Sequence, residues 1–489
     1  MRRAMLFPTV AFAIFFVVVL CISWLLMPRP VVWRLFIIGA SWFFYGWWDA
    51  RFVALLAGST LGNYFFGVAV WRSLRPTVDA GPVEVVDASP RERGPWTSWA
   101  LAAGIGMNLA LLGWFKYYEF FSTSLTNSLA DVGIDAPFPL LEVTLPIGIS
   151  FFTFQAISYL VDISRCQIRP MYPLDFAAYL SFFPHLVAGP IVRASEFGPQ
   201  LQRPADPNRV PVTEALTLIA AGLFKKVVVS TYLATEIVDP VFALPDQHSS
   251  LEIWVATYAY AVQIYADFSG YTDIAIGCAL LLGFRFPQNF DEPYRAFSVQ
   301  DFWRRWHMTL SRWLRDYVYI PLGGNRGASL FIARNLLLTM LLGGLWHGAA
   351  WTFVVWGGIH GGWMVIERFA IGEDRQGRWL PAVRWIVTFN VVCLAWIFFR
   401  AESVDVAFDM LGRLFSDWGG ASPLVTPLVV ATVAGMIALQ FVPSGWYRDL
   451  RVRLSHVPAV AQAVLFACAL VMVDALGPAG VAPFIYFQF

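Results

Sequence analysis

Long apolar stretches alternate with short polar intervals along most of the chain. A helix that crosses the hydrocarbon core of a bilayer needs about 17–25 predominantly apolar residues. Stretches of this length or longer cover residues 5–27, 31–48, 52–71, 97–115, 146–163, 251–283, 336–366, 383–399, 424–442 and 460–477. Because the stretch 251–283 exceeds what one span needs, we expect a tilted or broken helix there. The pattern predicts an all-α polytopic membrane protein.

Two further apolar segments are less regular. The segment FAAYLSFFPHLVAGPIV at 176–192 contains Pro184 and Pro190, and proline breaks helical hydrogen bonding because it has no backbone N–H. We expect this segment to be re-entrant or interfacial. The segment EALTLIAAGLFKKVVVSTYLA carries Lys225 and Lys226 in the middle of its run, which favours a helix that lies near one membrane surface.

The composition agrees with a membrane protein. Of the 489 residues, 58% are hydrophobic and 14% are charged, whereas soluble domains carry about 25% charged residues. The net charge is +1, so no basic surface points to nucleic acid, and no such partner is expected. Aromatic residues reach 17%, more than interfacial belts alone would use. Membrane lipid is therefore the first partner that the sequence implies.

The distribution of arginines orients the chain, because short cytoplasmic loops carry an excess of basic residues. The polar interval 72–96 holds four arginines and is expected to be cytoplasmic. Counting spans from there places the N-terminus and the acidic interval 116–145 outside. The interval 284–335 holds eight arginines against four acidic residues, so we expect it to be cytoplasmic as well.

One histidine lies inside an apolar stretch. In LLGGLWHGAAWTFVVWGGIHG, His347 is flanked by Gly343, Gly344 and Gly348. A titratable ring is costly in hydrocarbon and usually faces a bundle interior or a wet cavity. The small residues permit either close helix packing or the close approach of a substrate. Two interpretations remain open: a catalytic histidine, or a structural histidine that bonds a neighbouring helix.

A second stretch combines arginines with tryptophans. The segment FSVQDFWRRWHMTLSRWLRDYVYIPLGGNRG predicts a helix over residues 299–317, with Ser298 as its cap. Arginine suits phosphate recognition, and aromatic rings can stack on a nucleotide base. The alternative is an amphipathic helix at the cytoplasmic interface. The residues concerned are Trp303, Arg304, Arg305, Arg312 and Arg315.

Carboxylates also interrupt an apolar stretch, since Asp267 and Asp273 lie within 251–283. Such groups need partners, so we expect structural ion pairs to arginines of the 297–316 helix, with a proton relay as the alternative. For the histidines other than His347, the residues alone indicate hydrogen-bonded structural roles: His185, His248, His307, His360 and His456. The sequence contains no GxSxG, HExxH or Walker-type motif, and we expect no metal.

Several motifs together resemble a known family. QDFWRRWHMTLSRWLRDYVYIPLGGNR, followed by NLLLTMLLGGLWHGAAWTFVVWGGIHG, is similar to the signature of the membrane-bound O-acyltransferase (MBOAT) superfamily. LPIGISFFTFQAISYLVDISR, FFPHLVAGPIVR, YADFSGYTDIAIG, FRFPQNFDEPYRA and PFIYFQF resemble its bacterial alginate O-acetylase branch. The likeness is most characteristic over about 140–366. We therefore expect a single domain over 1–489, with a polar cytoplasmic loop at about 72–96.

This resemblance implies a fold and a site. The fold would be a ring of tilted transmembrane helices around a central tunnel, with re-entrant and cytoplasmic interfacial helices. The family's essential histidine maps onto His347, in WHGAAW, and its second characteristic polar position maps onto His307, in RWHMTLS. His347 would take the proton from an acceptor hydroxyl. His307 would orient the thioester or hydrogen-bond the developing oxyanion.

The resemblance also implies substrates. Acetyl-CoA would bind from the cytoplasm, with its phosphates on arginines of 285–334, and no cofactor would be permanently bound. The expected function is transfer of acetyl across the bacterial inner membrane for O-acetylation of an exported polysaccharide, most simply alginate or a similar polymer. Alternatives within the family are O-acetylation of peptidoglycan or cellulose and D-alanyl transfer to teichoic acid. The alternative from another class is a transporter of an acyl donor or polysaccharide.

A separate partner is expected outside the membrane. The interval 116–145 is about the largest external loop, far below the ~100 residues of a typical domain, so the chain carries no polysaccharide-handling module of its own. We expect the acetyl group to pass to a periplasmic acetyltransferase, or to a carrier protein that feeds one.

Overall fold

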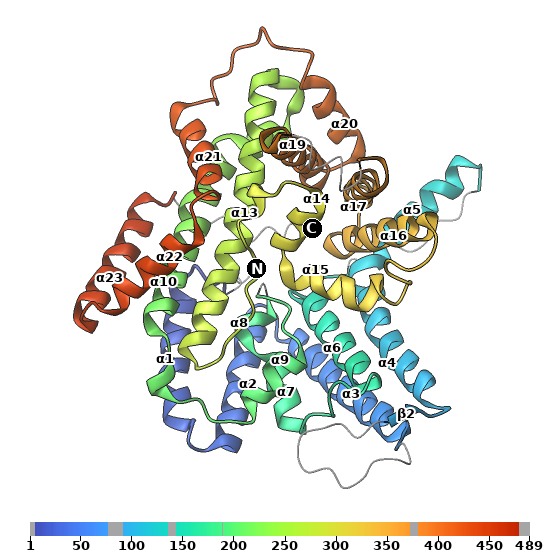
Figure 1. The fold of residues 1–489 in the computed structure, drawn as a ribbon, viewed down its shortest axis with the longest axis vertical. Helices are drawn as coiled ribbons and strands as arrows, with labels where there is room; N and C mark the ends of the chain where they lie inside the picture. The colour runs from blue at the N-terminus through green and yellow to red at the C-terminus, as the bar shows by residue number, and fades with distance from the viewer. Residues whose placement is uncertain (1–4, 77–90, 135–142, 188, 372–379, 479–489) are drawn as a thin grey trace. The chain divides into compact units, whose positions relative to one another are not determined.

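The computed structural model describes residues 5–76, 91–134, 143–187, 189–371 and 380–478, most of which are helical (Figure 1). It divides into two compact units: Met1–Pro211 with Cys278–Pro287, and Val212–Gly277 with Gln288–Phe489. The single domain expected over 1–489 stays a prediction. Within the predicted loop 72–96, residues 77–90 lie outside the described residues, as does the motif PFIYFQF.

The first unit packs its helices around aromatic side chains. Its elements are α1 Val10–Leu26, α2 Pro30–Gly46, α3 Arg51–Ser73, β1 Leu74–Pro76, β2 Arg91–Arg93, α4 Thr97–Leu112, η1 Gly113–Tyr117, α5 Tyr118–Asp131, α6 Ile149–Ser164, α7 Pro173–Ser181, α8 Phe183–Leu186, α9 Ala194–Leu201 and η2 Pro207–Arg209. Helices α3, α4 and α6 pack against one another, α2 packs against α7, and β1 pairs antiparallel with β2. The rings of Phe182, Phe197 and Phe284 lie 5.0–5.5 Å apart between centroids.

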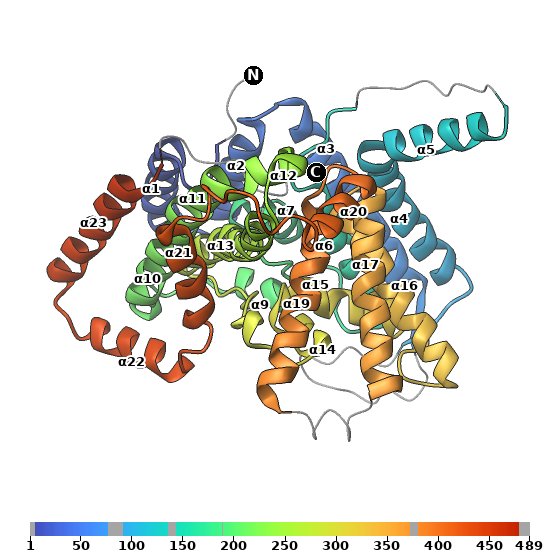
Figure 2. The ribbon, with the colours of Figure 1, turned by 90° about the horizontal axis from the view of Figure 1, so that it is seen from above.

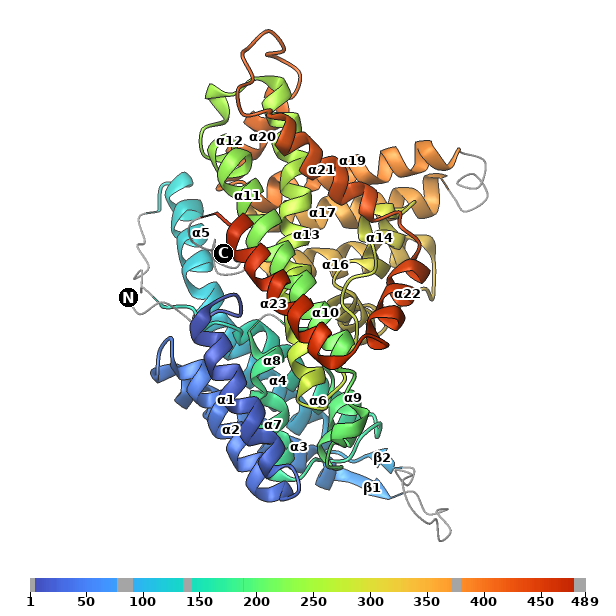
Figure 3. The same cartoon turned by 90° about the vertical axis from the view of Figure 1, so that its left-hand side faces the viewer.

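The second unit contains both histidines singled out above. Its elements are α10 Val212–Leu223, η3 Phe224–Ser230, α11 Thr231–Leu233, η4 Ala234–Val238, α12 Asp239–Ala243, η5 Pro245–Gln247, α13 Ser250–Leu281, η6 Pro293–Arg295, α14 Val299–Arg305, α15 Met308–Leu314, η7 Arg315–Tyr319, α16 Ser329–His347, α17 Trp351–Val365, η8 Ile366–Ile371, α19 Pro381–Arg400, α20 Val404–Arg413, α21 Pro427–Leu439, α22 Ser444–Ser455 and α23 Ala459–Leu476. The last turn of α13 belongs to the first unit. Helix α16 packs along α17, and α23 packs against α10 (Figure 3).

The helices confirm the prediction of a polytopic membrane protein. Among the described residues, five helices are long and apolar enough to cross a membrane: Arg51–Ser73, Thr97–Asp131, Ser329–His347, Pro381–Arg400 and Ala459–Leu476. Shorter apolar helices are Val10–Leu26, Pro30–Gly46, Ile149–Ser164 and Pro427–Leu439. These agree with apolar stretches read from the sequence. The arrangement as a ring around a tunnel stays a prediction.

Two long segments differ in detail from the sequence-based expectation. Helix α13 covers almost all of 251–283 without a break. The interval 116–145, expected as an external loop, begins with helix: the chain runs from α4 through the π-helical turn η1 into α5, which ends at Asp131 (Figure 2). Because a π-helical turn inserts an extra residue into the helical ladder, it lets the chain bend without ending the helix.

The expected helix near one membrane surface around Lys225 and Lys226 stays a prediction, and the structure shows the surroundings of the two lysines. Both lysines lie on the π-helix η3, and the Lys226 side chain is fully buried. A Cβ on Gly222 would lie 2.6 Å from the backbone oxygen of Gly270, so the α10–η3 segment approaches α13 closely. Both lysines have acidic partners on α13, namely Asp273 for Lys225 and Asp267 for Lys226.

Candidate active site

The predicted span 336–366 is two helices and not one. Helix α16 ends at His347, Gly348 and Ala350 have extended backbone, and α17 begins at Trp351. His347 is therefore the last residue of its helix. The last turn of a helix has backbone carbonyls without intrahelical partners, so a histidine there is in a more polar place than one at mid-helix.

The glycines beside this histidine are surrounded by protein. A Cβ on Gly344 would lie 2.2 Å from the backbone oxygen of Phe353, and a Cβ on Gly348 would lie 2.0 Å from the ring of the same residue. A Cβ on Gly343 would lie 3.1 Å from a leucine side chain of α15. Of the two uses that the sequence left open, the structure therefore shows close helix packing.

The helix predicted over 299–317 is broken at His307. Helices α14 and α15 flank this residue, whose φ is +41°. That is the left-handed region, which is uncommon for residues other than glycine and persists only where the surroundings enforce it. The predicted cap is confirmed, because the Ser298 hydroxyl accepts a hydrogen bond from the N–H of Asp301.

Asn289, on the segment before α14, holds this turn through hydrogen bonds to Met308 and Thr309. The backbone oxygen of Asn289 accepts from the N–H of Met308 at 2.8 Å. The side-chain oxygen of Asn289 accepts from the N–H of Thr309 at 3.1 Å. Asn289 thus positions His307. Sequence reasoning missed this role: the motif FRFPQNFDEPYRA entered only as part of a resemblance, and no local pattern connects it with a histidine 18 residues away.

The His307 side chain is fully buried. Its Nδ1 lies 3.2 Å from Oδ1 of Asn289, and its ring stands edge-on to that of Phe268 at a centroid distance of 4.7 Å. Burial lowers the pKa of His307 to about 3, so the ring is neutral at physiological pH. A neutral imidazole offers one N–H donor and one lone pair.

The structure brings His347 and His307 together. Their ring centroids are 6.4 Å apart. His347 is 2% exposed and lies against Trp356 at 5.0 Å and Phe399 at 5.3 Å, while Trp346 contacts both histidines at 5.0 and 5.8 Å. Two imidazole rings are thus buried side by side at helix ends among aromatic walls, away from bulk water.

Trp303 lies inside this aromatic cluster. It is buried, and its indole N–H donates to Nδ1 of His360 at 3.3 Å. The expected structural, hydrogen-bonded role of His360 agrees with this bond. The Trp303 ring meets that of Trp356 at 5.7 Å and so contributes to the wall behind it, while contact of Trp303 with a donor stays a prediction.

The arginines expected to contact acetyl-CoA lie on or near the surface. Arg305 forms ion pairs with Asp301 at 3.0 Å and Asp291 at 3.3 Å. Arg315 pairs with its neighbour Asp316 at 2.7 Å. Arg304 and Arg315 are exposed, and Arg305 and Arg312 are partly buried. Their contacts with a donor stay a prediction.

The two aspartates of α13 have lysine partners, which corrects the expected pairing with arginines of the 297–316 helix. Asp267 pairs with Lys226, and both side chains are buried. Asp273 pairs with Lys225 at 2.6 Å. These lysines lie on η3, 41 and 48 residues away in sequence from the aspartates. A relay role for either aspartate stays a prediction.

Glu367 is a second positioning residue that sequence reasoning missed. Its carboxylate accepts from the N–H of Val299 at 2.8 Å and from that of Gln300 at 3.4 Å, so it caps the helix that leads to His307. Burial raises the pKa of Glu367, although these N–H bonds act in the opposite direction. A carboxylate at a helix N-terminus is favourable because the first N–H groups have no intrahelical acceptors.

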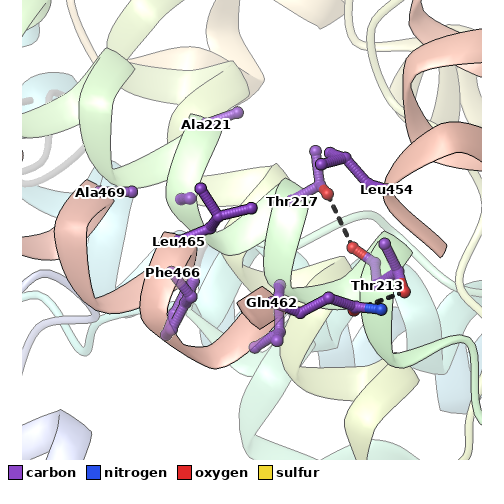
Figure 4. A pocket seen from close by; sticks show the side chains of 10 residues that line it. Thr213, Thr217, Ala221, Leu454, Gln462, Leu465, Phe466 and Ala469 are labelled. Atoms are coloured by element: carbon purple, nitrogen blue, oxygen red, sulfur yellow. Dashed lines mark hydrogen bonds between the residues drawn. The ribbon is translucent and has the colours of Figure 1, made fainter. Parts of the chain in front are cut away.

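A cavity of about 260 Å³ lies between α10, α22 and α23, away from this chemistry (Figure 4). Thr213, Thr217 and Gln462 contribute its polar atoms, and Thr213 is hydrogen-bonded to Gln462 at 2.8 Å. The other lining side chains are apolar: Leu216, Ala220, Ala221, Leu454, Leu465, Phe466 and Ala469. None of these lining side chains titrates near neutral pH, and the catalytic role expected for the histidine pair stays a prediction.

Comparison with known proteins finds relatives that cover most of the chain. A probable alginate O-acetylase of Pseudomonas putida is 40% identical over 483 residues, which cover 93% of this chain and 94% of that protein. The corresponding protein of Pseudomonas aeruginosa is 42% identical over 384 residues, covering 78% and 70%. The peptidoglycan O-acetyltransferase of Helicobacter pylori is 37% identical over 413 residues, covering 78% and 74%.

The family comparison covers the site itself. The membrane-bound O-acyltransferase family model matches residues 107–400, which is more than half of the chain and includes both His307 and His347. The apolar helices, the buried histidine pair and these matches lead to one conclusion: the chain belongs to the membrane-bound O-acyltransferase family and is an acyltransferase.

Proposed function

We propose that this protein is an O-acetyltransferase of the bacterial inner membrane that passes acetyl from cytoplasmic acetyl-CoA to the far side, for O-acetylation of an exported polysaccharide. The observation that carries the proposal is the buried pair of histidines, with ring centroids 6.4 Å apart. Alginate or an alginate-like polymer is the first acceptor to test, because relatives named for alginate reach 40–42% identity.

The proposed chemistry is transfer of acetyl from the thioester to the acceptor in one step, without an acyl-enzyme on this chain. His347 takes the proton from the acceptor hydroxyl as its oxygen attacks the thioester carbonyl. The new C–O bond forms, the C–S bond breaks, and the proton passes from the imidazolium to the leaving sulfur, so that CoA departs as the thiol. A placed general base contributes about 10²–10⁴ in rate. The aromatic walls around His347 exclude water, which would otherwise compete as the acceptor.

Acetyl-CoA is proposed to enter from the side that carries the 284–335 arginines. Arg304 and Arg315 are exposed there, and arginine pairs well with phosphate oxygens. The interval between α4 and α6 is the largest expected external one, and part of it is α5, a 14-residue helix. An interval of this size does not hold a polysaccharide-handling domain, so we propose a periplasmic acetyltransferase or carrier protein as the receiving partner.

Peptidoglycan is the second candidate acceptor, because the peptidoglycan O-acetyltransferase of Helicobacter pylori covers 78% of this chain at 37% identity. The two candidates share donor and mechanism and differ only in the polymer. Purified alginate and peptidoglycan strands, offered separately to the same preparation together with the proposed periplasmic partner, distinguish them.

The test is reconstitution in liposomes, with acetyl-CoA on one face and polymer on the other. We expect acetyl-CoA turnover by the protein itself, and polymer acetylation only when a periplasmic acetyltransferase from the same gene cluster is added. His347→Ala should lower turnover at least about 100-fold, since it removes the base. His307→Ala should lower it severely, but less completely.

The matched control is His456→Ala, which removes an exposed histidine at the end of α22. It should leave turnover and thermal stability unchanged. Full turnover by well-folded His347→Ala protein would refute the mechanism, and robust polymer acetylation without any added protein would refute the relay. A transporter without chemistry would tolerate His347→Gln, because a polar pore lining survives that change, and would leave acetyl-CoA intact.

A further inference from the structure

The side-chain oxygen of Asn289 is surrounded by hydrogen-bond donors. The backbone N–H of Thr309 donates to Oδ1 at 3.1 Å, and the Thr309 hydroxyl donates to the same atom at 2.8 Å. Nδ1 of His307 lies 3.2 Å from it. Asn289 is itself buried, so bulk water does not compete for this oxygen.

The orientation of this amide is determined by the main chain. A backbone N–H can only donate, so the atom of Asn289 that faces Thr309 must be the oxygen and not the NH₂ group. An amide oxygen can only accept. The nitrogen of His307 that faces the same oxygen must therefore carry the proton, which makes the neutral ring the Nδ1–H tautomer.

The other nitrogen of the ring follows from this assignment. A neutral imidazole has one proton, so Nε2 of His307 holds a lone pair. This atom is buried and has no hydrogen-bond partner among the described residues. A lone pair left unpaired in a protein interior costs free energy, so this atom calls for an explanation, and a substrate group that donates to it is one.

We infer that Asn289 is a positioning residue, and that through it His307 presents Nε2 to the substrates as a hydrogen-bond acceptor. The inference rests on the proposed acetyl transfer and specifies the part that His307 takes in it. Nε2 receives an X–H group, either the acceptor hydroxyl or an amide N–H of the pantetheine arm. The resemblance implied two roles for His307: to orient the thioester, or to hydrogen-bond the developing oxyanion. In this tautomer Nε2 has no proton to donate to an oxyanion, so the role in orienting the substrate remains.

Protonation of the ring would turn Nε2 of His307 from a hydrogen-bond acceptor into a donor, because an imidazolium donates from both nitrogens. Burial opposes that state, since it lowers the pKa of His307 to about 3. No carboxylate accepts from either ring nitrogen among the described residues; the partner of Nδ1 is a neutral amide. The neutral tautomer is therefore the one that meets substrate.

The first arm of the test is spectroscopic. Protein labelled with ¹⁵N at histidine, held in nanodiscs, gives Nδ1 and Nε2 resonances whose shifts and proton couplings report the tautomer, and His307→Gln assigns the signals. We expect a protonated Nδ1 and an unprotonated Nε2 at neutral pH. A protonated Nε2 would overturn the inference. This measurement needs no activity, so it stands even if the proposed acetyl transfer fails.

The second arm is kinetic. Asn289→Leu removes the acceptor and should release the tautomer, so transfer should fall about 100-fold. Asn289→Asp keeps an oxygen acceptor facing both Thr309 and His307 and should lose less than Asn289→Leu, with the larger loss at low pH, where the new carboxylate favours the protonated ring. The matched control is Gln288→Leu, because this neighbouring side chain is exposed and bonds only the backbone oxygen of Phe290.

The readout separates positioning from a merely structural role. Asn289→Leu protein that keeps its thermal stability and the Nδ1–H signal of the wild type, with normal transfer, would overturn the assignment. If Nε2 receives the acceptor hydroxyl, polymer transfer falls while slow acetyl-CoA hydrolysis is kept. If it receives the pantetheine amide, KM for acetyl-CoA rises in both reactions. A variant with neither change would show that His307 does not contact substrate.

Discussion

At the scale of single residues, two buried opposite charges, those of Lys226 and Asp267, are held as a pair. Lys226 is fully buried and Asp267 is 2% exposed, and Ser230 also donates to the aspartate at 3.3 Å. Taking one charge into a low-dielectric interior is costly, and the partner offsets this only while both are present. The pair therefore ties η3 to α13.

We predict that Lys226→Met lowers the free energy of unfolding by about 3–5 kcal/mol, because it leaves Asp267 as an uncompensated buried charge. The double variant Lys226→Met with Asp267→Leu should recover much of this loss, since both charges are then absent. Thermal unfolding of detergent-solubilised protein, followed by tryptophan fluorescence, measures the difference.

The control for this pair lies one residue away. Lys225 and Asp273 are less buried, with side-chain exposures of 17% and 24%, so Lys225→Met should cost only about 1 kcal/mol. Equal losses in the free energy of unfolding for Lys225→Met and Lys226→Met would show that burial does not determine how much each ion pair contributes to stability.

At the scale of elements, the hairpin of α16 and α17 places the histidine. A Cβ on Gly344 would lie 2.2 Å from the backbone oxygen of Phe353, and a Cβ on Gly357 would lie 2.4 Å from that of Met340. Backbone faces backbone at both positions, and neither can move as a flexible side chain would. The hairpin thus depends on glycine at both positions where the helices cross. Gly344 lies three residues before His347, and Gly357 lies ten residues after it.

We predict that Gly344→Ala destabilises the protein by about 1–3 kcal/mol through overpacking, and that it lowers acetyl-CoA turnover because the end of α16 shifts. Gly362→Ala, on the same hairpin, is the matched control: a Cβ there meets nothing within 4 Å. It should leave turnover unchanged and stabilise the helix slightly, by about 0.5–1 kcal/mol. Equal behaviour of the two variants in unfolding and turnover assays would contradict this account of the hairpin.

At the scale of the whole molecule, the distribution of charge predicts which segments lie on the cytoplasmic face of the membrane. The interval 284–335 carries eight arginines, and among them Arg304, Arg315 and Arg326 are exposed. Cytoplasmic segments carry this kind of excess. The donor, acetyl-CoA, is a cytoplasmic metabolite in the proposed function, so the chemistry and the charge distribution require the same side.

We predict that a cysteine at Ala328, in a background without the five native cysteines, resists an impermeant thiol reagent in intact cells and reacts after permeabilisation. Ala328 is exposed and precedes α16 with ordinary backbone, whereas Gly327 beside it has φ +99° and does not suit a side chain. A cysteine at Ser128, exposed on α5, should label in intact cells. If intact cells label at Ala328 and not at Ser128, the topology is the opposite of the one predicted.

By itself, the sequence determined the membrane class and the approximate extent of most helices. It also singled out His347 and His307 as candidate site residues. Hydropathy records the free energy of moving each residue from water to lipid, which is a local property that survives without knowledge of the fold. His347 stood out for the same reason, because a titratable ring in an apolar run is costly wherever the run lies. His307 was found only through the resemblance.

Only the tertiary structure decided which groups meet. Hydropathy does not separate one long helix from a hairpin of two, so the break after His347 followed only from the packing of α16 on α17. The bond from His307 to Asn289 and the pairing of Lys226 with Asp267 join residues 18 and 41 apart. Such partners depend on which backbones approach closely enough for side chains to bond, and that distance is a property of the packed molecule and not of any local stretch.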